Sequence, residues 1–352
     1  MSYLTVPMRI LLKRKHYRGK NAGRSIFMII FSCFTVTYII SQDINFSLYK
    51  FNPVFLNPAN TGNFYGSWRI AANYRNQWAA TSTPFTTASA SLDKKFKIVN
   101  RDVAAGMLFL NDESGVGGIT YNKLYGSFSY SHTIGKNYFF AGIQAGYVSG
   151  SVNSWYNWNQ TTGDFTSPNG EINFGENTSY LDINAGISWK RKINIIEPEI
   201  GFALSHLNAP PNSFLTGSDE KEAMKFTVHA ELRTNISDRI YFSPAVAYFG
   251  MEGASLTIAG TDIGYNFPGN LSTVKSIYAG LYLRDGILTN VDALNLMLGA
   301  AIGKLDLGLG YDMNISDLSK SSGSNLGAFE VSVIYRIVGV VLNSYSIPCE
   351  RY

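Results

Sequence analysis

The sequence contains few cysteines, few charged residues and no long apolar run beyond its first 41 positions. Two cysteines in 352 residues exclude a disulfide-stapled scaffold. Charged residues make up 15% of the chain, against roughly 25% in an average soluble protein. Zinc-binding histidine spacings, a G-x-S-x-G elbow and a phosphate-binding glycine loop before a helix do not occur. The sequence therefore predicts no metal site, no cofactor and no catalytic residue.

The residues that are abundant suit a β-protein with an apolar exterior. Aromatic residues make up 14% of the chain, and there are 33 glycines. Apolar and polar side chains alternate over runs of about 9–11 residues, the length of a tilted transmembrane strand. Ile183 and Val228 fall on the apolar face, Asn184 and His229 on the polar face. This predicts an all-β transmembrane antiparallel barrel; a soluble sandwich also alternates, but gains nothing from so few charges.

Fourteen strands are predicted, and the lengths of their connections predict an orientation. The strands span residues 66–75, 85–94, 102–110, 121–133, 137–149, 179–191, 197–205, 225–235, 239–249, 253–265, 274–284, 293–303, 305–314 and 327–337. Connections after strands 3, 5, 7 and 13 are long, and those after strands 4, 6, 8 and 12 are short. Outer-membrane barrels have short periplasmic turns, so we expect residues 150–179 and 206–225 outside the cell, and a long connection at 111–120.

The first 41 residues predict a secretory signal peptide. Seven basic residues and no acid precede the apolar run Ile26–Ile40, which is short of the about 20 residues that a spanning helix needs. Cleavage is predicted between Ser41 and Gln42; a membrane anchor and a lipoprotein site at Cys33 are the alternatives. Without this leader the chain has 22 basic and 25 acidic residues, so no nucleic-acid partner is expected.

The predicted organisation has four parts: signal peptide 1–41, N-terminal non-strand segment 42–65, barrel 66–337 and C-terminal tail 338–352. The segment 42–65 is rich in aromatic and turn residues, and we expect it to pack in the lumen or at the periplasmic mouth. Both mature termini are predicted to be periplasmic, in the outer membrane of a Gram-negative bacterium. Aromatic and arginine side chains are frequent anchors at protein interfaces. The candidate partner-contact residues are Phe46, Tyr49, Phe51, Asn57, Pro58, Arg75, Asn76, Gln77, Trp78, Asp312 and Asn314.

Several blocks in this order resemble the PorP/SprF family of the type IX secretion system of Bacteroidota. Residues 42–62 read QDINFSLYKFNPVFLNPANTG, where the family has QDPxFSQYxFNPxxxNPAxAG. The likeness continues with YRNQW at 74–78, GYDMNISDL at 310–318, Phe329-Glu330, and PCxRY at 348–352. Departures from the family pattern are Ile44 for Pro, Leu48 for Gln, Asn60-Thr61 for Tyr-Ala, and Glu350 for Pro.

The resemblance implies a non-catalytic outer-membrane barrel that docks the export machinery, a secreted adhesin with a C-terminal sorting domain, or both. In gliding species the partner it implies is a large surface adhesin. Outer-membrane lipid surrounds such a barrel, and no small-molecule substrate is expected. The alternative is a porin or a transporter of solutes or hydrophobic compounds; a barrel enzyme is a third class. A lumen filled by the N-terminal segment favours docking, whereas an open channel favours the porin.

Overall fold

The strands begin and end close to their predicted positions. This computed structural model describes residues 43–78, 84–99, 101–114, 118–152, 177–214, 217–268, 273–286, 290–315 and 327–337. The strands are β1 (Trp68–Gln77), β2 (Phe85–Ile98), β3 (Arg101–Ser114), β4 (Ile119–Ile134), β5 (Asn137–Val152), β6 (Asn177–Arg191), β7 (Ile196–Ser205), β8 (Lys225–Asn235), β9 (Ile240–Met251), β10 (Ala254–Asn266), β11 (Val274–Gly286), β12 (Asn290–Ile302), β13 (Leu305–Asn314) and β14 (Ala328–Ile337).

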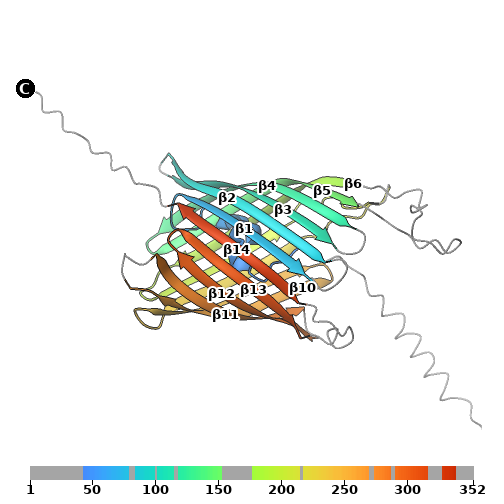
Figure 1. The fold of residues 1–352 in the computed structure, drawn as a ribbon. Coiled ribbons are helices and arrows are strands. Elements are labelled where there is room, and N and C mark those ends of the chain that lie inside the picture. The colour runs from blue at the N-terminus through green and yellow to red at the C-terminus, as the bar shows by residue number, and fades with distance from the viewer. Residues whose placement is uncertain are drawn as a thin grey trace, which may run out of the picture. The chain divides into compact units, whose positions relative to one another are not determined.

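These strands form one closed antiparallel barrel (Figure 1). Each strand pairs with its neighbours in sequence, and β14 closes the barrel by pairing with β1 from Trp68↔Ile337 to Gln77↔Ala328. Closure leaves no sheet edge, which is what a strand-built membrane protein requires. The predicted fold class and strand number are confirmed.

Side chains alternate between the outside of the barrel and its lumen. Ile183 is 45% exposed and Val228 40% exposed, whereas the adjacent Asn184 and His229 are buried. Apolar side chains on the outside can face lipid, and polar ones on the inside can pair with one another. The predicted register of β6 and β8 is confirmed.

The two ends of the barrel differ in their connections. We call the end where even-numbered strands turn into the next strand the turn end, and the opposite end the loop end. Most turn-end connections are two to four residues long, while the loop end carries the long connections 153–176 and 206–224. One expectation was wrong: residues 115–118 alone connect β3 to β4. The polar residues assigned to a long loop continue the ladder instead, with Asn111 hydrogen-bonded to Asn122 at 2.9 Å.

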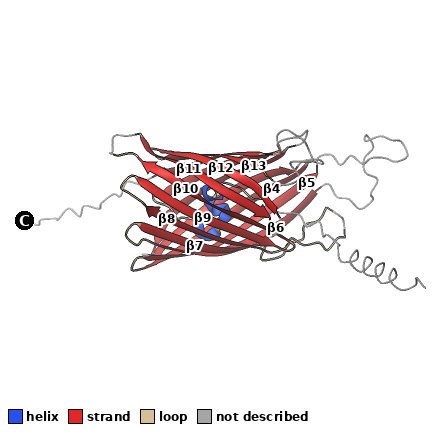
Figure 2. Cartoon of the chain, turned by 90° about the horizontal axis from the view of Figure 1, so that it is seen from below, coloured by secondary structure: helices blue, strands red, loops and turns tan. Residues whose placement is uncertain are grey.

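Residues 43–67 lie in the lumen, and we call them the plug. They form the 3-10 helices η1 (Tyr49–Phe51) and η2 (Pro58–Asn60) and the one-turn helix α2 (Pro53–Leu56), seen inside the barrel in Figure 2. Proline at the first position favours the start of a helix because it needs no hydrogen-bond partner for its nitrogen. Asn57 caps η2 by accepting a hydrogen bond from the Ala59 amide at 2.9 Å.

None of the helices in the described part of the chain is long and apolar enough to cross a membrane.

The plug runs lengthwise through the lumen. Asp43 contacts Lys123 and Lys225 near the loop end, whereas β1 begins and β14 finishes at the turn end. The expectation that the mature chain starts at the same end as β1 is therefore wrong, because a non-strand segment of this length crosses the lumen before β1. The predicted leader 1–41, the Ser41–Gln42 cleavage site and the tail 338–352 lie outside the described residues.

Candidate functional site

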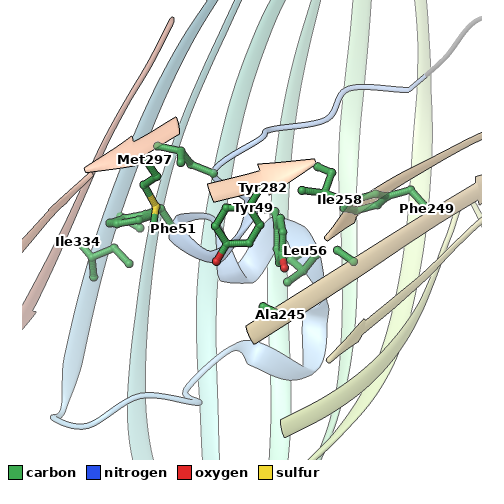
Figure 3. Close-up of a cluster of buried hydrophobic side chains, with 12 residues drawn as sticks. Tyr49, Phe51, Leu56, Ala245, Phe249, Ile258, Tyr282, Met297 and Ile334 are labelled. Atoms are coloured by element: carbon green, nitrogen blue, oxygen red, sulfur yellow. The ribbon is translucent and has the colours of Figure 1, made fainter. Parts of the chain in front are cut away.

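Aromatic and aliphatic side chains anchor the plug to opposite walls of the lumen. Tyr49, Phe51 and Leu56 join a buried cluster with side chains from β9, β10, β11, β12 and β14 (Figure 3). Val54 belongs to a second cluster, with side chains from β3 to β6. Phe46 is buried and packs edge-to-face on Phe55, with ring centroids 5.7 Å apart. Burial of this apolar surface on both sides holds the plug across the lumen.

The Asn57-Pro58 turn fits closely into the wall. The Asn57 side-chain amide donates to the Ile187 carbonyl at 3.1 Å and lies 3.2 Å from Nε2 of His229. A methyl group on Gly186 would lie 2.0 Å from the Asn57 side-chain oxygen, and one on Gly142 would lie 2.4 Å from the Pro58 carbonyl. Both contacts are far inside van der Waals distance, so the wall needs glycine at these two positions.

A buried ionic cluster binds the plug backbone near the loop end. Glu330 accepts hydrogen bonds from the amides of Ser47 at 2.7 Å and Leu48 at 2.8 Å. The Arg75 guanidinium pairs with Glu330 and, at 2.8 Å, with Asp312. Asp312 also accepts a 2.6 Å hydrogen bond from the Ser47 hydroxyl. Each carboxylate thus faces a cation and a hydrogen-bond donor of the plug, as buried charges must.

Two further ionic contacts fix the plug toward the turn end. The Lys50 ammonium lies 3.0 Å from Glu231 and 2.5 Å from Asp262. Asp93 accepts the Gly62 amide at 2.7 Å, and Arg69 binds the same carboxylate through two nitrogens at 2.8 and 2.9 Å. Two-point binding by arginine fixes the carboxylate orientation as well as its charge.

The first described residue, Asp43, is held by three basic groups at the loop end. Lys123 lies 3.2 Å from its carboxylate, Lys225 contacts it directly, and Nε2 of His206 lies 3.7 Å away. Nδ1 of His206 lies 3.0 Å from Asp182. Burial lowers the pKa of His206, but the two carboxylates outweigh it and raise this pKa to about 9. His206 is therefore protonated at neutral pH and completes this cluster as a cation.

The structure gives most of the candidate partner-contact residues an internal place. The buried candidates are Phe46, Tyr49, Phe51, Asn57, Pro58, Arg75 and Asp312. Their side chains contact other parts of the same chain, so in this state they are not a surface for a partner. The remaining candidates Asn76, Gln77, Trp78 and Asn314 are half-buried at the loop end, and a role for them in partner contact stays a prediction.

Sequence reasoning missed the wall residues that receive the plug. Glu330, Asp93 and His206 were not candidates, because each lies more than 30 positions from the plug atoms it binds. A signal was present in the pattern itself. Glu330 and Asp93 occupy lumen-facing positions of strands, where an isolated carboxylate would be costly.

Charge is distributed unequally between the two ends. We assigned each described Lys, Arg, Asp and Glu to the half of the barrel in which its strand position or contacts place it. The turn half has 15 basic and 8 acidic residues, and the loop half has 5 basic and 12 acidic ones. Nine basic residues of the turn half have no carboxylate at ion-pair distance among the described residues: Lys94, Lys95, Arg101, Lys136, Arg191, Arg233, Arg239, Lys275 and Lys304.

The plug leaves open cavities at the turn end. One, of about 570 Å³, lies between the plug and the wall, and we call it the vestibule. It is lined by charged residues of both signs and by the aromatic rings of Tyr49, Phe64 and Tyr65. In the described part of the chain, no group of three or more His, Cys, Asp and Glu side chains is arranged to hold a metal ion.

An apolar exterior, an ion-paired interior and a closed ladder of strands define a β-barrel outer-membrane protein with an internal plug. The chain belongs to the family of type IX secretion system membrane proteins PorP/SprF, whose family model matches residues 39–335. This is a family of membrane proteins rather than of enzymes.

Solved structures with a similar fold are distant in sequence. The TodX deltaS2S3 mutant, a monoaromatic hydrocarbon channel, is 9% identical with a TM-score of 0.52, over 80% of this chain and 93% of that one. The toluene transporter TbuX of Ralstonia pickettii is 9% identical with a TM-score of 0.48, over 81% of this chain and 93% of that one. The first likeness supports the barrel fold alone. No curated protein matches the sequence.

Proposed function

We propose that this protein is a non-catalytic component of the type IX secretion system that docks the export machinery, a secreted surface protein carrying a C-terminal sorting domain, or both. The observation that carries the proposal is the plug. Side chains from both sides of the lumen pack on it, and four ionic contacts fix it. A barrel filled in this way is suited to presenting its ends to proteins rather than to passing solutes.

The orientation is part of the proposal. Short turns of outer-membrane barrels face the periplasm, which places the turn end there and the long connections 153–176 and 206–224 outside the cell. The plug then starts near the outer mouth and β1 starts at the periplasmic rim. An epitope inserted at Gly217, within the second long connection, should be bound by antibody on intact cells. If the antibody binds only after permeabilisation, the barrel has the opposite orientation.

Deletion of the gene tests the docking function. We expect surface display of one or a few sorting-domain proteins to be lost, while outer-membrane integrity, measured by exclusion of a large antibiotic, is unchanged. The control is the same strain complemented with the full-length chain. Unchanged secretion, together with porin-like conductance of the purified barrel in planar bilayers, would support the porin or transporter alternative instead.

A further inference from the structure

The turn end of the barrel and the vestibule present positive charge that no carboxylate of the described residues neutralises. At the loop end, four of the five basic residues are paired with carboxylates: Arg75, Lys123, Lys225 and Arg284. In the turn half, nine of the fifteen have no carboxylate partner within the described part of the chain. Unpaired cations on one surface create a field that attracts an acidic partner and speeds its association.

Three of these unpaired cations line the vestibule. They are Arg233 at the end of β8, Lys275 at the start of β11 and Lys304 in the turn between β12 and β13. Arg233 lies over the ring of Tyr241, 4.0 Å from its centroid, and contacts no carboxylate in the described chain. The three come from β8, β11 and the turn between β12 and β13, so they line the cavity from separate parts of the sequence.

The vestibule also carries aromatic surface from the plug. Tyr65 is 81% exposed and Phe64 lies beside it, and both line the cavity. Phe64 is fixed between two cations, with Arg69 at 4.7 Å and Lys95 at 4.8 Å from its ring centroid. A rigid ring next to unpaired cations binds a peptide that offers carboxylates and an apolar or aromatic side chain.

We propose that the vestibule is the docking site for an acidic segment of a periplasmic protein partner, anchored by Arg233, Lys275 and Lys304 and by the exposed ring of Tyr65. This proposal rests on the docking function and the orientation proposed above, and it adds the surface and the chemistry of the partner. A lipid headgroup is the competing source of negative charge. It is disfavoured because the cavity is bounded by the plug and the lumen wall, whereas lipid contacts the outside of the barrel.

Binding of a defined probe to the purified full-length protein in a zwitterionic detergent tests this site. The probe is a fluorescein-labelled hexapeptide of alternating acidic and tyrosine residues, and the control probe has Gln and Asn in place of the acids. Fluorescence anisotropy should show binding of the acidic probe alone. Because each exposed charge contributes modestly and three are removed, the triple variant Arg233→Gln, Lys275→Gln, Lys304→Gln should bind roughly tenfold more weakly.

A matched variant distinguishes binding of the probe in the vestibule from its general attraction to the positive charge of the turn end. The triple variant Arg101→Gln, Lys136→Gln, Arg239→Gln removes three cations of the same end of the barrel that do not line the vestibule. We expect it to bind the probe within about twofold of the unaltered protein, since rim charges away from a contact act mainly on the rate of association. Equal weakening by both triple variants would overturn the proposal.

Three further outcomes are decisive. If dihexanoyl-phosphatidylglycerol binds in dependence on the three cations and the acidic peptide does not, the vestibule is a lipid site and the proposal fails. Heat-modifiability on gels shows that each variant is folded.

If the peptide fails to bind although deletion of the gene abolishes display, the docking function stands and this site does not. If the peptide binds but deletion leaves secretion unchanged, the docking function is refuted, and so is the partner class assigned to the site.

Discussion

The buried ionic cluster at the loop end and the exposed cations at the turn end use charge in opposite ways. At the loop end, the carboxylates of Asp43, Asp312 and Glu330 are buried and each faces at least one cation. At the turn end, Lys275 and Lys304 are exposed without a carboxylate partner among the described residues. Buried charges need partners because desolvation is costly, whereas exposed ones remain in water at little cost. The first arrangement fixes a structure, and the second leaves charge available for binding.

The largest effect is expected from breaking the buried cluster at the loop end. Glu330→Ala removes the acceptor of the Ser47 and Leu48 amides and leaves Arg75 with Asp312 alone. Breaking a buried ion pair costs about 3–5 kcal/mol. The free energy of unfolding in urea, measured on barrels in lipid vesicles, should fall by that amount. The control is Glu252→Ala, in the exposed turn after β9. An equal loss of unfolding free energy in this variant would show that the buried cluster contributes no more to stability than an exposed carboxylate.

A cation on the outer face should have the next largest effect. Ile183→Lys places charge against lipid and should lower the free energy of unfolding by about 2–4 kcal/mol near the bilayer midplane. Ile236→Lys, in a connection of the turn end, should lower it by about 0–1 kcal/mol. Both residues are exposed apolar side chains, so they differ chiefly in depth. Urea unfolding of the two variants measures the difference. Equal stability would refute the depth assigned to β6.

The fit of the plug against the wall should respond to a single methyl group. Gly186→Ala brings carbon to the Asn57 side chain, and overpacking of this kind costs about 1–3 kcal/mol. Gly126→Ala is the matched control, because the nearest atom to its added methyl group lies 4.0 Å away. Protease digestion of the plug in the folded barrel should quicken in the first variant only. Identical digestion rates in the two variants would show that the wall accommodates the added methyl group without destabilising the bound plug.

The smallest effect should come from pH at the loop-end cluster. The pKa of His206 is raised in the folded protein to about 9, above its ordinary value of about 6.5. Its stabilisation is therefore complete below pH 6.5 and is lost as the pH rises through about 9. A cysteine at Asn45 should react with maleimide a few-fold faster, relative to a free thiol, at pH 10 than at pH 6. In a His206→Gln background this pH dependence should largely disappear; if it persists, the lysines beside Asp43 are its source.

The strands could be predicted from the sequence because the polarity of each side chain indicates whether it faces lipid or lumen. Ile183 and Asn184 are adjacent, and their exposures differ as the alternation requires. The plug's location in the lumen was one of two expected places, since its aromatic residues needed a surface to cover. Its contacts could not be predicted. Asn57 meets His229 across 172 positions, and Lys225 meets Asp43 across 182, and such pairs depend on closure of the whole barrel.

The pairing of Arg75 with Glu330 has a consequence for the order of assembly. These two residues are direct cross-strand neighbours at the β1–β14 junction, the last pair of strands to meet in chain order. The Glu330 carboxylate also binds the plug backbone. Pairing of β1 with β14 and binding of the plug therefore depend on the same side chain. A chain without residues 43–51 should therefore reach its heat-modifiable form more slowly than the full chain. In that case the plug would serve as an internal template on which the final strand closes.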